Sequence, residues 1–278
     1  MLKRIITSIV ATIIFIPVLI FSNTVVFPIA IAIIALISTY EMAKCMGFDK
    51  KLYMTVPVYL VAVALPFLMK YLSFTHTAII AFVCAVIYLL YLFVIIICSH
   101  WKLSFNEAIS FFAVTAYILA ALNSIMYIRY FDDSGKYIYL LIFFGAWMTD
   151  IFAYFTGVFF GKHKLIEDVS PKKTIEGSIG GMFFCTLSFV IFGIIVGKFF
   201  DRDANLILLA ISGLLMSVVS QIGDLIMSVI KRQHNIKDYG KIFPGHGGML
   251  DRFDSILAVS IGLSCICMLV RLLGLQLL

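Results

Sequence analysis

Apolar runs recur along the whole chain, and their lengths indicate its architecture. The runs hold about 18 to 25 residues each, enough to cross a hydrocarbon core of roughly 30 Å as helices. They are Ile5–Phe21, Val25–Ala43, Leu52–Met69, Thr77–Ser99, Ala108–Ile128, Tyr137–Phe160, Ile179–Gly197, Leu206–Ile230 and Met249–Leu273. Lipid offers no partners to backbone N–H and C=O groups, so only helices and closed barrels span it. The pattern predicts an all-α integral membrane protein, a polytopic helical bundle of about nine transmembrane helices.

The composition agrees with this prediction. The chain is 63% hydrophobic and 13% charged, with a mean hydropathy of +1.09. A soluble domain carries about twice that share of charge. The first run follows Lys3 and Arg4, as a secretory signal would, but it is too long for a signal core and lacks a small-residue cleavage pattern before Asn23. We expect an uncleaved first span.

Lysines and arginines are distributed unevenly between the two sides of the predicted spans. With nine spans and the N-terminus inside, 15 of the 21 lie inside and six outside, as the positive-inside rule requires. This predicts a cell-membrane protein with its N-terminus in the cytoplasm and its C-terminus outside. Two basic segments, Gly161–Gly177 and Lys231–Gly248, then face the cytoplasm. The net charge of +6 indicates contact with anionic headgroups, not nucleic acid.

The two halves of the chain differ in their polar content. Residues 1–135 carry no motif with a chemical role, and we expect them to be scaffold helices. Glu41, Asp49 and Glu107 lie near predicted span ends, where solvated charges are ordinary. Residues 136–278 hold the candidate catalytic motifs, within one continuous membrane domain. The six cysteines show neither a disulfide framework nor metal-ligand spacing, and the inverted repeat of many transporters is missing from the sequence.

The first cluster of candidate residues surrounds a predicted helix start. Asp150 lies inside an apolar run, where an ionisable group costs a few kcal/mol or more unless it is paired, hydrated or metal-bound. A structural hydrogen bond between helices is the alternative. Downstream lie Ser170, Lys172, Lys173, Thr174 and Glu176. Thr174 and Gly177 are candidate caps, and helix N-termini attract anions, so this segment is a candidate phosphate clamp. Simple contact with lipid headgroups is the other interpretation.

Glycines spaced by four form a separate pattern. The pairs are Gly157/Gly161, Gly177/Gly181 and Gly193/Gly197. Small residues at this spacing let membrane helices approach closely. We expect these glycines to serve helix packing.

A second cluster lies at the end of one predicted span and the start of the next. Asp224, Ser228 and Lys231 fall at i, i+4 and i+7, on one stripe of a helix, and Arg232 follows. Asp251 and Asp254 share a face at i and i+3 of the last span. Carboxylates from two helices at the cytoplasmic surface suit Mg²⁺, which keeps waters and shares substrate phosphates. We expect Asp224, Asp251 and Asp254 to bind the metal.

A glycine-rich turn at residues 244–248 joins these two spans. Its glycines, Gly245, Gly247 and Gly248, allow backbone N–H groups to approach a phosphate chain. His246 is a candidate hydrogen-bond donor or proton relay, although a lone loop histidine is more often neither. Lys237 and Arg252 flank the turn and are further candidates for binding phosphate.

These motifs together resemble the signature of the phosphatidate cytidylyltransferase family, also called CDP-diacylglycerol synthases. The matching residues include Asp150, Ser170, Lys172, Lys173, Thr174, Glu176, Ser228, Lys231, Arg232, Lys237, Gly245, His246, Gly247, Gly248, Asp251, Arg252 and Asp254. The likeness covers roughly Trp147 to Asp254. The N-terminal half resembles the family only in its hydrophobic pattern.

The resemblance implies an enzyme of phospholipid synthesis. Such an enzyme transfers CMP from CTP to phosphatidate with Mg²⁺, giving CDP-diacylglycerol and pyrophosphate. It also implies a metal centre at Asp224, Asp251 and Asp254 that includes K⁺, and a homodimer in the lipid bilayer. On this interpretation Lys172, Lys173, Lys231 and Arg232 bind phosphates, and His246 with its neighbouring glycines cradles the nucleotide. Ser228 orients a carboxylate or phosphate.

Two other functions fit the same motifs. One is a related CTP-using enzyme that acts on an isoprenoid lipid, either a polyprenyl-phosphate cytidylyltransferase or a lipid kinase. Its metal and phosphate machinery would look the same, because a groove for lipid tails leaves no motif. The other is a transporter with a cytoplasmic anion site. Against a transporter, the candidate acids gather at one face and do not line a pathway.

Overall fold

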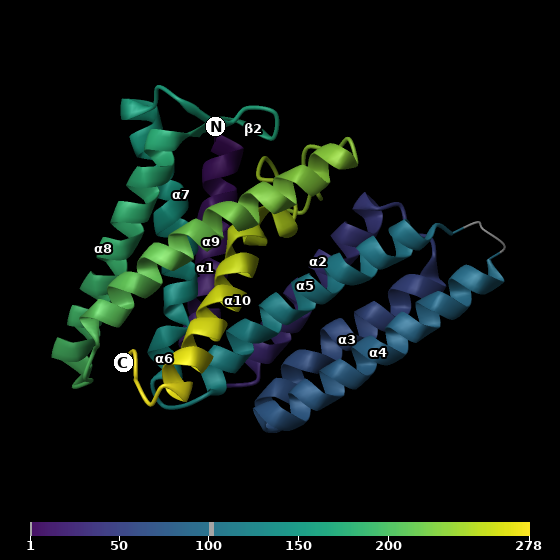
Figure 1. Ribbon diagram of the computed structural model, residues 1–278, viewed down its shortest axis with the longest axis horizontal. Helices are drawn as coiled ribbons and strands as arrows, with labels where there is room; N and C mark the ends of the chain where they lie inside the picture. Colours follow the sequence, from purple (N-terminus) through teal and green to yellow (C-terminus); the bar gives the residue numbers. More distant parts are fainter. Residues whose placement is uncertain (1, 100–102) are drawn as a thin grey trace. The chain divides into compact units, whose positions relative to one another are not determined.

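Helices occupy nearly every apolar run of the chain (Figure 1). The computed structural model describes residues 2–99 and 103–278, with side chains from Val10 onward in the first helix. The helices are α1 (Leu2–Ile20), α2 (Val26–Cys45), α3 (Leu52–Tyr71), α4 (Phe74–Cys98), α5 (Phe105–Tyr130), α6 (Gly135–Ile138), α7 (Leu140–Phe160), α8 (Ile175–Phe200), α9 (Leu206–Gln233) and α10 (Leu250–Leu272). The strands are β1 (Lys164–Ile166) and β2 (Ser170–Thr174). Among the cations counted above, Lys102 and the side chains of Lys3 and Arg4 lie outside the described residues.

Eight stretches of the described residues are long and apolar enough to cross a membrane: α2, α3, α4, α5, α8, α9, α10, and α6 and α7 together as Gly135–Phe160. The predicted polytopic helical membrane protein is therefore confirmed. In α4 only 6% of the most apolar window is buried inside the protein, and a helix that is apolar all round is typical of a lipid-facing span. The first predicted span corresponds to α1, of which the stretch Val10–Ile20 has described side chains.

The segment between α7 and α8 is more ordered than the sequence indicated. We expected a basic loop over residues 161–177, and this segment contains an antiparallel hairpin of β1 and β2. Lys164 pairs with Thr174, and Ile166 pairs with Ser170. Strands this short carry too few alternating positions for their periodicity to be recognised.

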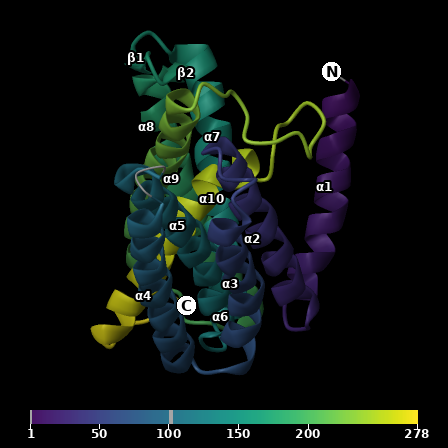
Figure 2. The same cartoon turned by 90° about the vertical axis from the view of Figure 1, so that its right-hand side faces the viewer.

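The described chain divides into two compact units. The first comprises Met1–Tyr127 and His234–Arg252. Within it, α2 packs against α3, and α3 packs against α4 (Figure 2). Buried apolar side chains such as Met42 of α2 and Met54 of α3 form its core. This unit therefore contains α1 to α4, most of α5, and the loop that precedes α10.

The second unit comprises Ile128–Gln233 and Phe253–Leu278. In it α8 packs against both α7 and α9, and α7 and α9 also contact each other. A Cβ added at Gly177 would lie 2.6 Å from the Ala153 carbonyl oxygen, and one at Gly181 would lie 3.0 Å from the Thr149 carbonyl oxygen. The predicted packing role of these glycines is confirmed, because any side chain there would separate α7 from α8. Gly223 of α9 faces α10 in the same way.

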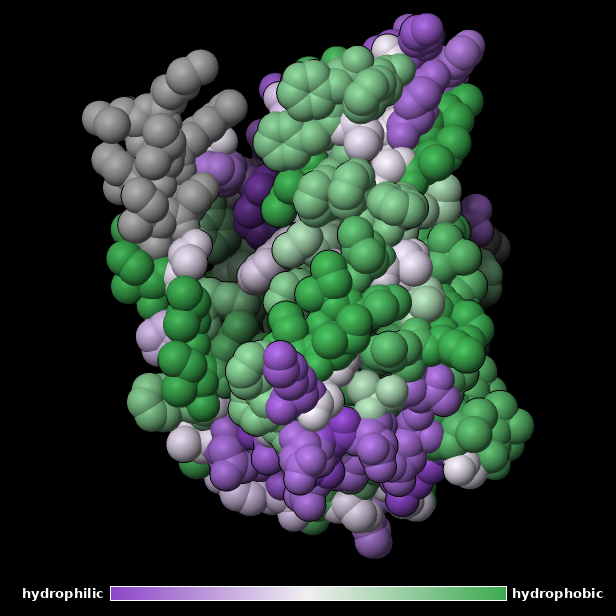
Figure 3. All heavy atoms as spheres, turned by 90° about the vertical axis from the view of Figure 1, so that its left-hand side faces the viewer, coloured by the Kyte–Doolittle hydropathy of each residue, from purple (hydrophilic) through white to green (hydrophobic). Residues whose placement is uncertain are grey.

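The outer surfaces of the helices are strongly apolar. Large exposed side chains of α7 and α8 include Phe155, Phe159 and Phe183. Figure 3 shows hydrophobic atoms over the middle of the face that it draws, bordered by hydrophilic atoms. Lipid tails are the solvent that suits such a surface. None of the six cysteines, all of them within the described residues, forms a disulfide, and of the six only Cys185 is buried.

Candidate functional site

An ion pair joins the two segments that the sequence analysis singled out. Lys173 of β2 places its Nζ 2.6 Å from Asp224 Oδ2 of α9, and each side chain is about one quarter exposed. The Ser228 hydroxyl donates a 3.4 Å hydrogen bond to the other oxygen of Asp224. Ser228 lies one helical turn beyond Asp224, as the predicted stripe requires. The basic hairpin and Asp224 of α9 therefore form one site.

Two further carboxylates lie close to this pair. Asp254 of α10 is partly buried, and both Asp224 and Asp150 lie near enough to repel its charge. The Ser255 hydroxyl donates a 3.3 Å hydrogen bond to Asp150 Oδ2, which links α10 to α7. Asp150 is exposed and belongs to the same cluster. Thus Asp150, which the sequence left between a structural and a functional role, has both a hydrogen-bond partner and a place beside the other acids.

Lysines offset part of this negative charge. Lys231 is only 9% exposed and attracts Asp254, and Lys173 pairs with Asp224. Arg232, the next residue after Lys231, is exposed. Three acids and two lysine amines from β2, α7, α9 and α10 therefore meet at one place in the second unit. Such an arrangement can hold a cation on its carboxylates and a phosphate on its amines.

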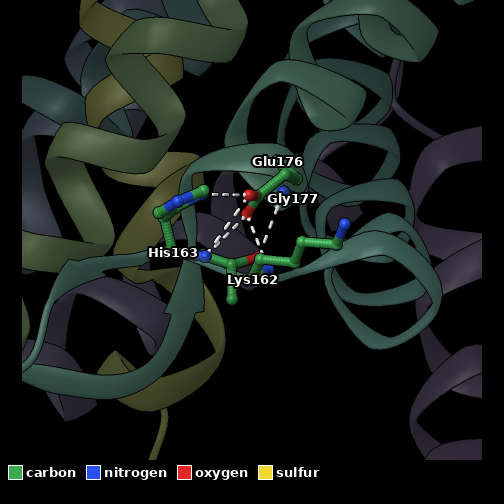
Figure 4. Close-up of polar contacts among 5 residues, drawn as sticks. Lys162, His163, Glu176 and Gly177 are labelled. Carbon is green, nitrogen blue, oxygen red and sulfur yellow. Dashed lines mark hydrogen bonds and ion pairs between the residues drawn. The ribbon is translucent and has the colours of Figure 1, made fainter.

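The hairpin is fastened at its base by the start of α8 (Figure 4). Thr174 Oγ1 accepts a 3.1 Å hydrogen bond from the Gly177 N–H, which confirms Thr174 as the N-cap. The Glu176 carboxylate accepts hydrogen bonds from the Lys162 N–H at 3.1 Å and the His163 N–H at 3.2 Å, and lies 2.7 Å from His163 Nδ1. α8 consequently begins at Ile175, ahead of the predicted span, and Glu176 is engaged with backbone.

In the first unit, Asp251 is tied to the loop before α10. The side chain is 6% exposed, and its Oδ2 accepts hydrogen bonds from the Tyr239 N–H at 2.8 Å and the Gly248 N–H at 2.9 Å. Asp251 therefore determines the path of the loop, whatever else it binds. One of the glycine N–H groups that we expected to face a phosphate donates instead to this carboxylate.

The glycine-rich turn is closed on itself. The Phe243 N–H donates to the Gly247 carbonyl, and the His246 N–H donates to the Phe243 carbonyl, both at 2.9 Å. Gly245 and Gly247 have φ angles of +82° and +86°, which disfavour any residue with a side chain. A Cβ at Gly247 would also lie 2.6 Å from Asp251 Oδ2. These two glycines are thus required by the shape of the turn.

The expectation of a solvated charge at Glu41 is wrong. Glu41 of α2 is 3% exposed, and its carboxylate oxygens accept hydrogen bonds from the Met249 N–H at 3.0 Å and the Leu250 N–H at 2.9 Å. It therefore caps α10 from the opposite half of the sequence. The signal was present, since Glu41 falls inside the predicted span Val25–Ala43, and an acid inside an apolar run indicated a role for Asp150.

The other candidates lie at or near the surface. Lys172 and Gly245 are exposed, as are Lys237 and Arg252 in the first unit; Ser170 and His246 are partly buried. No group of three or more His, Cys, Asp or Glu side chains in the described residues has a metal-binding arrangement. Mg²⁺ commonly takes only one or two carboxylates and completes its shell with water and substrate phosphate. The Asp224 and Asp254 pair fits that donor set.

Comparisons with known proteins agree on one family. Residues 2–270 match the sequence profile described as the Cytidylyltransferase family. A phosphatidate cytidylyltransferase of Staphylococcus haemolyticus (strain JCSC1435) is 35% identical over 259 residues, which cover 92% of this chain and 95% of the relative. One of Staphylococcus aureus (strain COL) is 45% identical over 127 residues, covering 46% of this chain and 47% of the relative.

Proposed function

This chain belongs to the cytidylyltransferase family, and we propose that it transfers CMP from CTP to phosphatidate, leaving CDP-diacylglycerol in the membrane and releasing pyrophosphate. The ion pair of Lys173 with Asp224 supports this function most directly, because it joins a basic segment to carboxylates of the membrane helices. CTP reaches such a site from water, while the diacyl tails remain among the helices. The product serves phospholipid synthesis.

The reaction needs little help from a protein base. A phosphate oxygen of phosphatidate attacks the α-phosphorus of CTP; that P–O bond forms, and the bond from the α-phosphorus to the bridging oxygen breaks. The electron pair leaves with pyrophosphate. A phosphate monoester has a second pKa of about 6, so near neutral pH the attacking oxygen is already largely unprotonated. The main barrier is the repulsion between two polyanions, which fixed cations reduce.

Lysines of the hairpin and of α9 are the proposed phosphate ligands. Lys173 and Lys231 already lie among the carboxylates. Lys172 precedes Lys173 in the sequence and Arg232 follows Lys231, and both are exposed. Because a lysine amine donates up to three hydrogen bonds, Lys173 can keep Asp224 as a partner while it binds a phosphate oxygen. Ser228 orients Asp224, and Glu176 with Thr174 fixes the hairpin that carries Lys173.

The loop before α10 completes the proposed set. His246 is the donor to the nucleotide phosphates, with Lys237 and Arg252 as further cations. Gly245, Gly247 and Gly248 give the loop its shape. Asp251 holds the loop and, at i and i+3 with Asp254 on α10, contributes to binding the metal.

Asp224, Asp254 and Asp251 would hold Mg²⁺, and the family resemblance adds K⁺ to the proposal. Bound there, Mg²⁺ supplies positive charge that offsets the charge on the transferring phosphoryl group and the pyrophosphate. The lysines around it determine where the two phosphates lie. A homodimer and a cytoplasmic site are also part of the proposal, the latter from the 15 to 6 distribution of cations.

A purified-protein assay tests the function. Wild-type protein in detergent, given labelled CTP, Mg²⁺ and phosphatidate, is expected to form CDP-lipid and pyrophosphate in equal amounts. Asp251→Asn is expected to lose at least about 100-fold in rate, the scale seen when a group that stabilises transferring charge is removed. Full activity of Asp251→Asn would contradict its assignment.

The same assay discriminates the other candidate functions. A polyprenyl phosphate offered beside phosphatidate should be the poorer acceptor, and a preference for it would identify an isoprenoid enzyme. Transfer to no phosphate lipid would refute the proposed function. Substrate-dependent flux in proteoliposomes without pyrophosphate release would indicate a transporter.

A further inference from the structure

Glu41 is the one acid of the N-terminal half that is buried against the loop before α10. α10 begins at Leu250, and the first N–H groups of a helix have no partners within the helix itself. Glu41 satisfies two neighbouring N–H groups at this point, those of Met249 and Leu250, with a different oxygen for each. A carboxylate at a helix N-terminus is also favoured by the helix dipole.

The loop is built closely around this carboxylate. A methyl group added at Gly248 would lie 2.6 Å from Glu41 Cδ, and one at Gly240 would lie 2.8 Å from the same atom. The two glycines also approach each other, because a Cβ at Gly240 would lie 3.1 Å from Gly248 Cα. The absence of side chains at these two positions therefore makes the space that Glu41 fills.

Glu41 and Asp251 share the N–H groups of one short backbone segment. Gly248 donates to Asp251, and the next two residues, Met249 and Leu250, donate to Glu41. Asp251 also accepts from Tyr239, at the other end of the loop. The backbone that carries Asp251 and His246 is thus held by two carboxylates, and loss of either leaves buried N–H groups without their partner.

We infer that Glu41 is a positioning residue for cytidylyl transfer: it fixes the loop of residues 239–250 and so the orientation of Asp251. The inference rests on the proposed function for the role of Asp251. A glutamine in place of Glu41 would have one oxygen and one NH₂ group. Its NH₂ group would then face one of the two backbone N–H groups, and two donors cannot form a hydrogen bond with each other. The negative charge is therefore required as well as the length of the side chain.

The test compares Glu41→Gln with Glu41→Asp and with Glu107→Gln in the full-length protein. Glu107 is the matched control, because it accepts a hydrogen bond from the Ser104 N–H near the start of its own helix and is exposed. Glu41→Gln is expected to lower kcat by about 10- to 100-fold, the range for residues that orient a metal ligand, with an unchanged KM for phosphatidate. Glu41→Asp should recover part of this loss, and Glu107→Gln should match the wild type.

Hydrogen exchange measured on the same proteins gives a readout that is independent of activity. In Glu41→Gln the amides of residues 239–250 should exchange at least about tenfold faster, while those of α8 and α9 keep their wild-type rates. Wild-type exchange in the loop, or unchanged kcat, would overturn the inference; so would a loss explained entirely by a smaller folded fraction. If the wild type transfers no CMP, the proposed function fails, and the exchange result still decides whether Glu41 holds the loop.

Gly248→Ala tests the same contact by changing the loop in place of Glu41, and it replaces Glu41→Gln in the test if that variant does not fold. Its methyl group would meet the Glu41 carboxylate, so it should show the same loss of kcat and the same faster exchange. Adding Glu41→Asp should partly restore kcat to Gly248→Ala, because the shorter acid leaves room for the methyl group. If the double variant instead lost as much kcat as Gly248→Ala and Glu41→Asp lose separately when added together, the result would count against the contact.

Discussion

At the scale of single residues, the second unit balances its charges in pairs. Lys173 binds Asp224, and Lys231 attracts Asp254, while Asp150 has the Ser255 hydroxyl. When a carboxylate is already paired with an ammonium group, a competing cation must displace that group. The free energy of cation binding is therefore less favourable by roughly the free energy of the ion pair. Lys173 therefore has two opposed effects, since it competes with a metal for Asp224 and binds the phosphate that accompanies the metal.

Lys173→Met should separate these two effects. Binding of Mn²⁺, used as a spectroscopic substitute for Mg²⁺, is expected to become about two- to fivefold tighter, as loss of a partly exposed pair of roughly 0.5–1 kcal/mol implies. Turnover should fall by about 100-fold or more, because a phosphate ligand is lost. Electron paramagnetic resonance titration in nanodiscs measures the first quantity, and the CDP-lipid assay measures the second.

Lys164→Met is the matched control for that variant. Lys164 belongs to the same hairpin and is exposed, and the proposed mechanism gives it no role. It should leave both Mn²⁺ binding and turnover near the wild-type values. Weaker Mn²⁺ binding in Lys173→Met would contradict the competition between lysine and metal.

At the scale of elements, α8 has two functions. Its first turn fastens the hairpin through Thr174 and Glu176, and the glycines that follow bring it against α7. Because Gly177 takes part in both, donating its N–H to Thr174 and lying against the Ala153 carbonyl, the position of the hairpin depends on the spacing between the two helices. A change in helix packing is therefore transmitted to Lys173.

Gly177→Ala tests this dependence. Its methyl group would lie 2.6 Å from the Ala153 carbonyl oxygen, so the variant should lose about 1–3 kcal/mol of stability, the usual cost of overpacking. At Gly197, at the other end of α8, a Cβ would lie 3.3 Å from the Arg202 carbonyl oxygen, so Gly197→Ala should be near neutral or slightly stabilising. Unfolding by SDS in mixed micelles, followed by circular dichroism, measures both. Equal stability of the two variants would refute the close packing at Gly177.

At the scale of the whole molecule, sequence reasoning succeeds where a physical rule acts over a short stretch. Lipid fixes the length and apolarity of the spans, and four-residue spacing identifies Gly177 and Gly181 as packing glycines. Contacts between distant residues leave no such local record. Neither the pairing of Lys173 with Asp224 nor that of Glu41 with Leu250 follows from spacing, and the short hairpin has too little periodicity. The acid inside an apolar run was the available signal for Glu41.

The orientation of the chain is a prediction at this scale. A variant without native cysteines should react with a membrane-impermeant thiol reagent at Lys241→Cys only in inside-out vesicles, and at Lys136→Cys only in right-side-out vesicles. Both positions are exposed, so the difference reports the side of the membrane. A C-terminal tag should be accessible from outside if α1 crosses the bilayer. If the C-terminal tag were accessible from the cytoplasm, an even number of helices would cross the membrane.

The cap on α10 also has a consequence for the order of events during synthesis. Glu41 and the Met249 N–H that it accepts are 208 residues apart. At about 5–20 residues per second, the ribosome needs roughly 10–40 s to bridge that gap. Until then α2 carries an acid whose backbone partners have not been made, with Lys44 one turn away as an attracting charge. The nascent chain therefore cannot complete the burial of Glu41 until the start of its last helix has emerged.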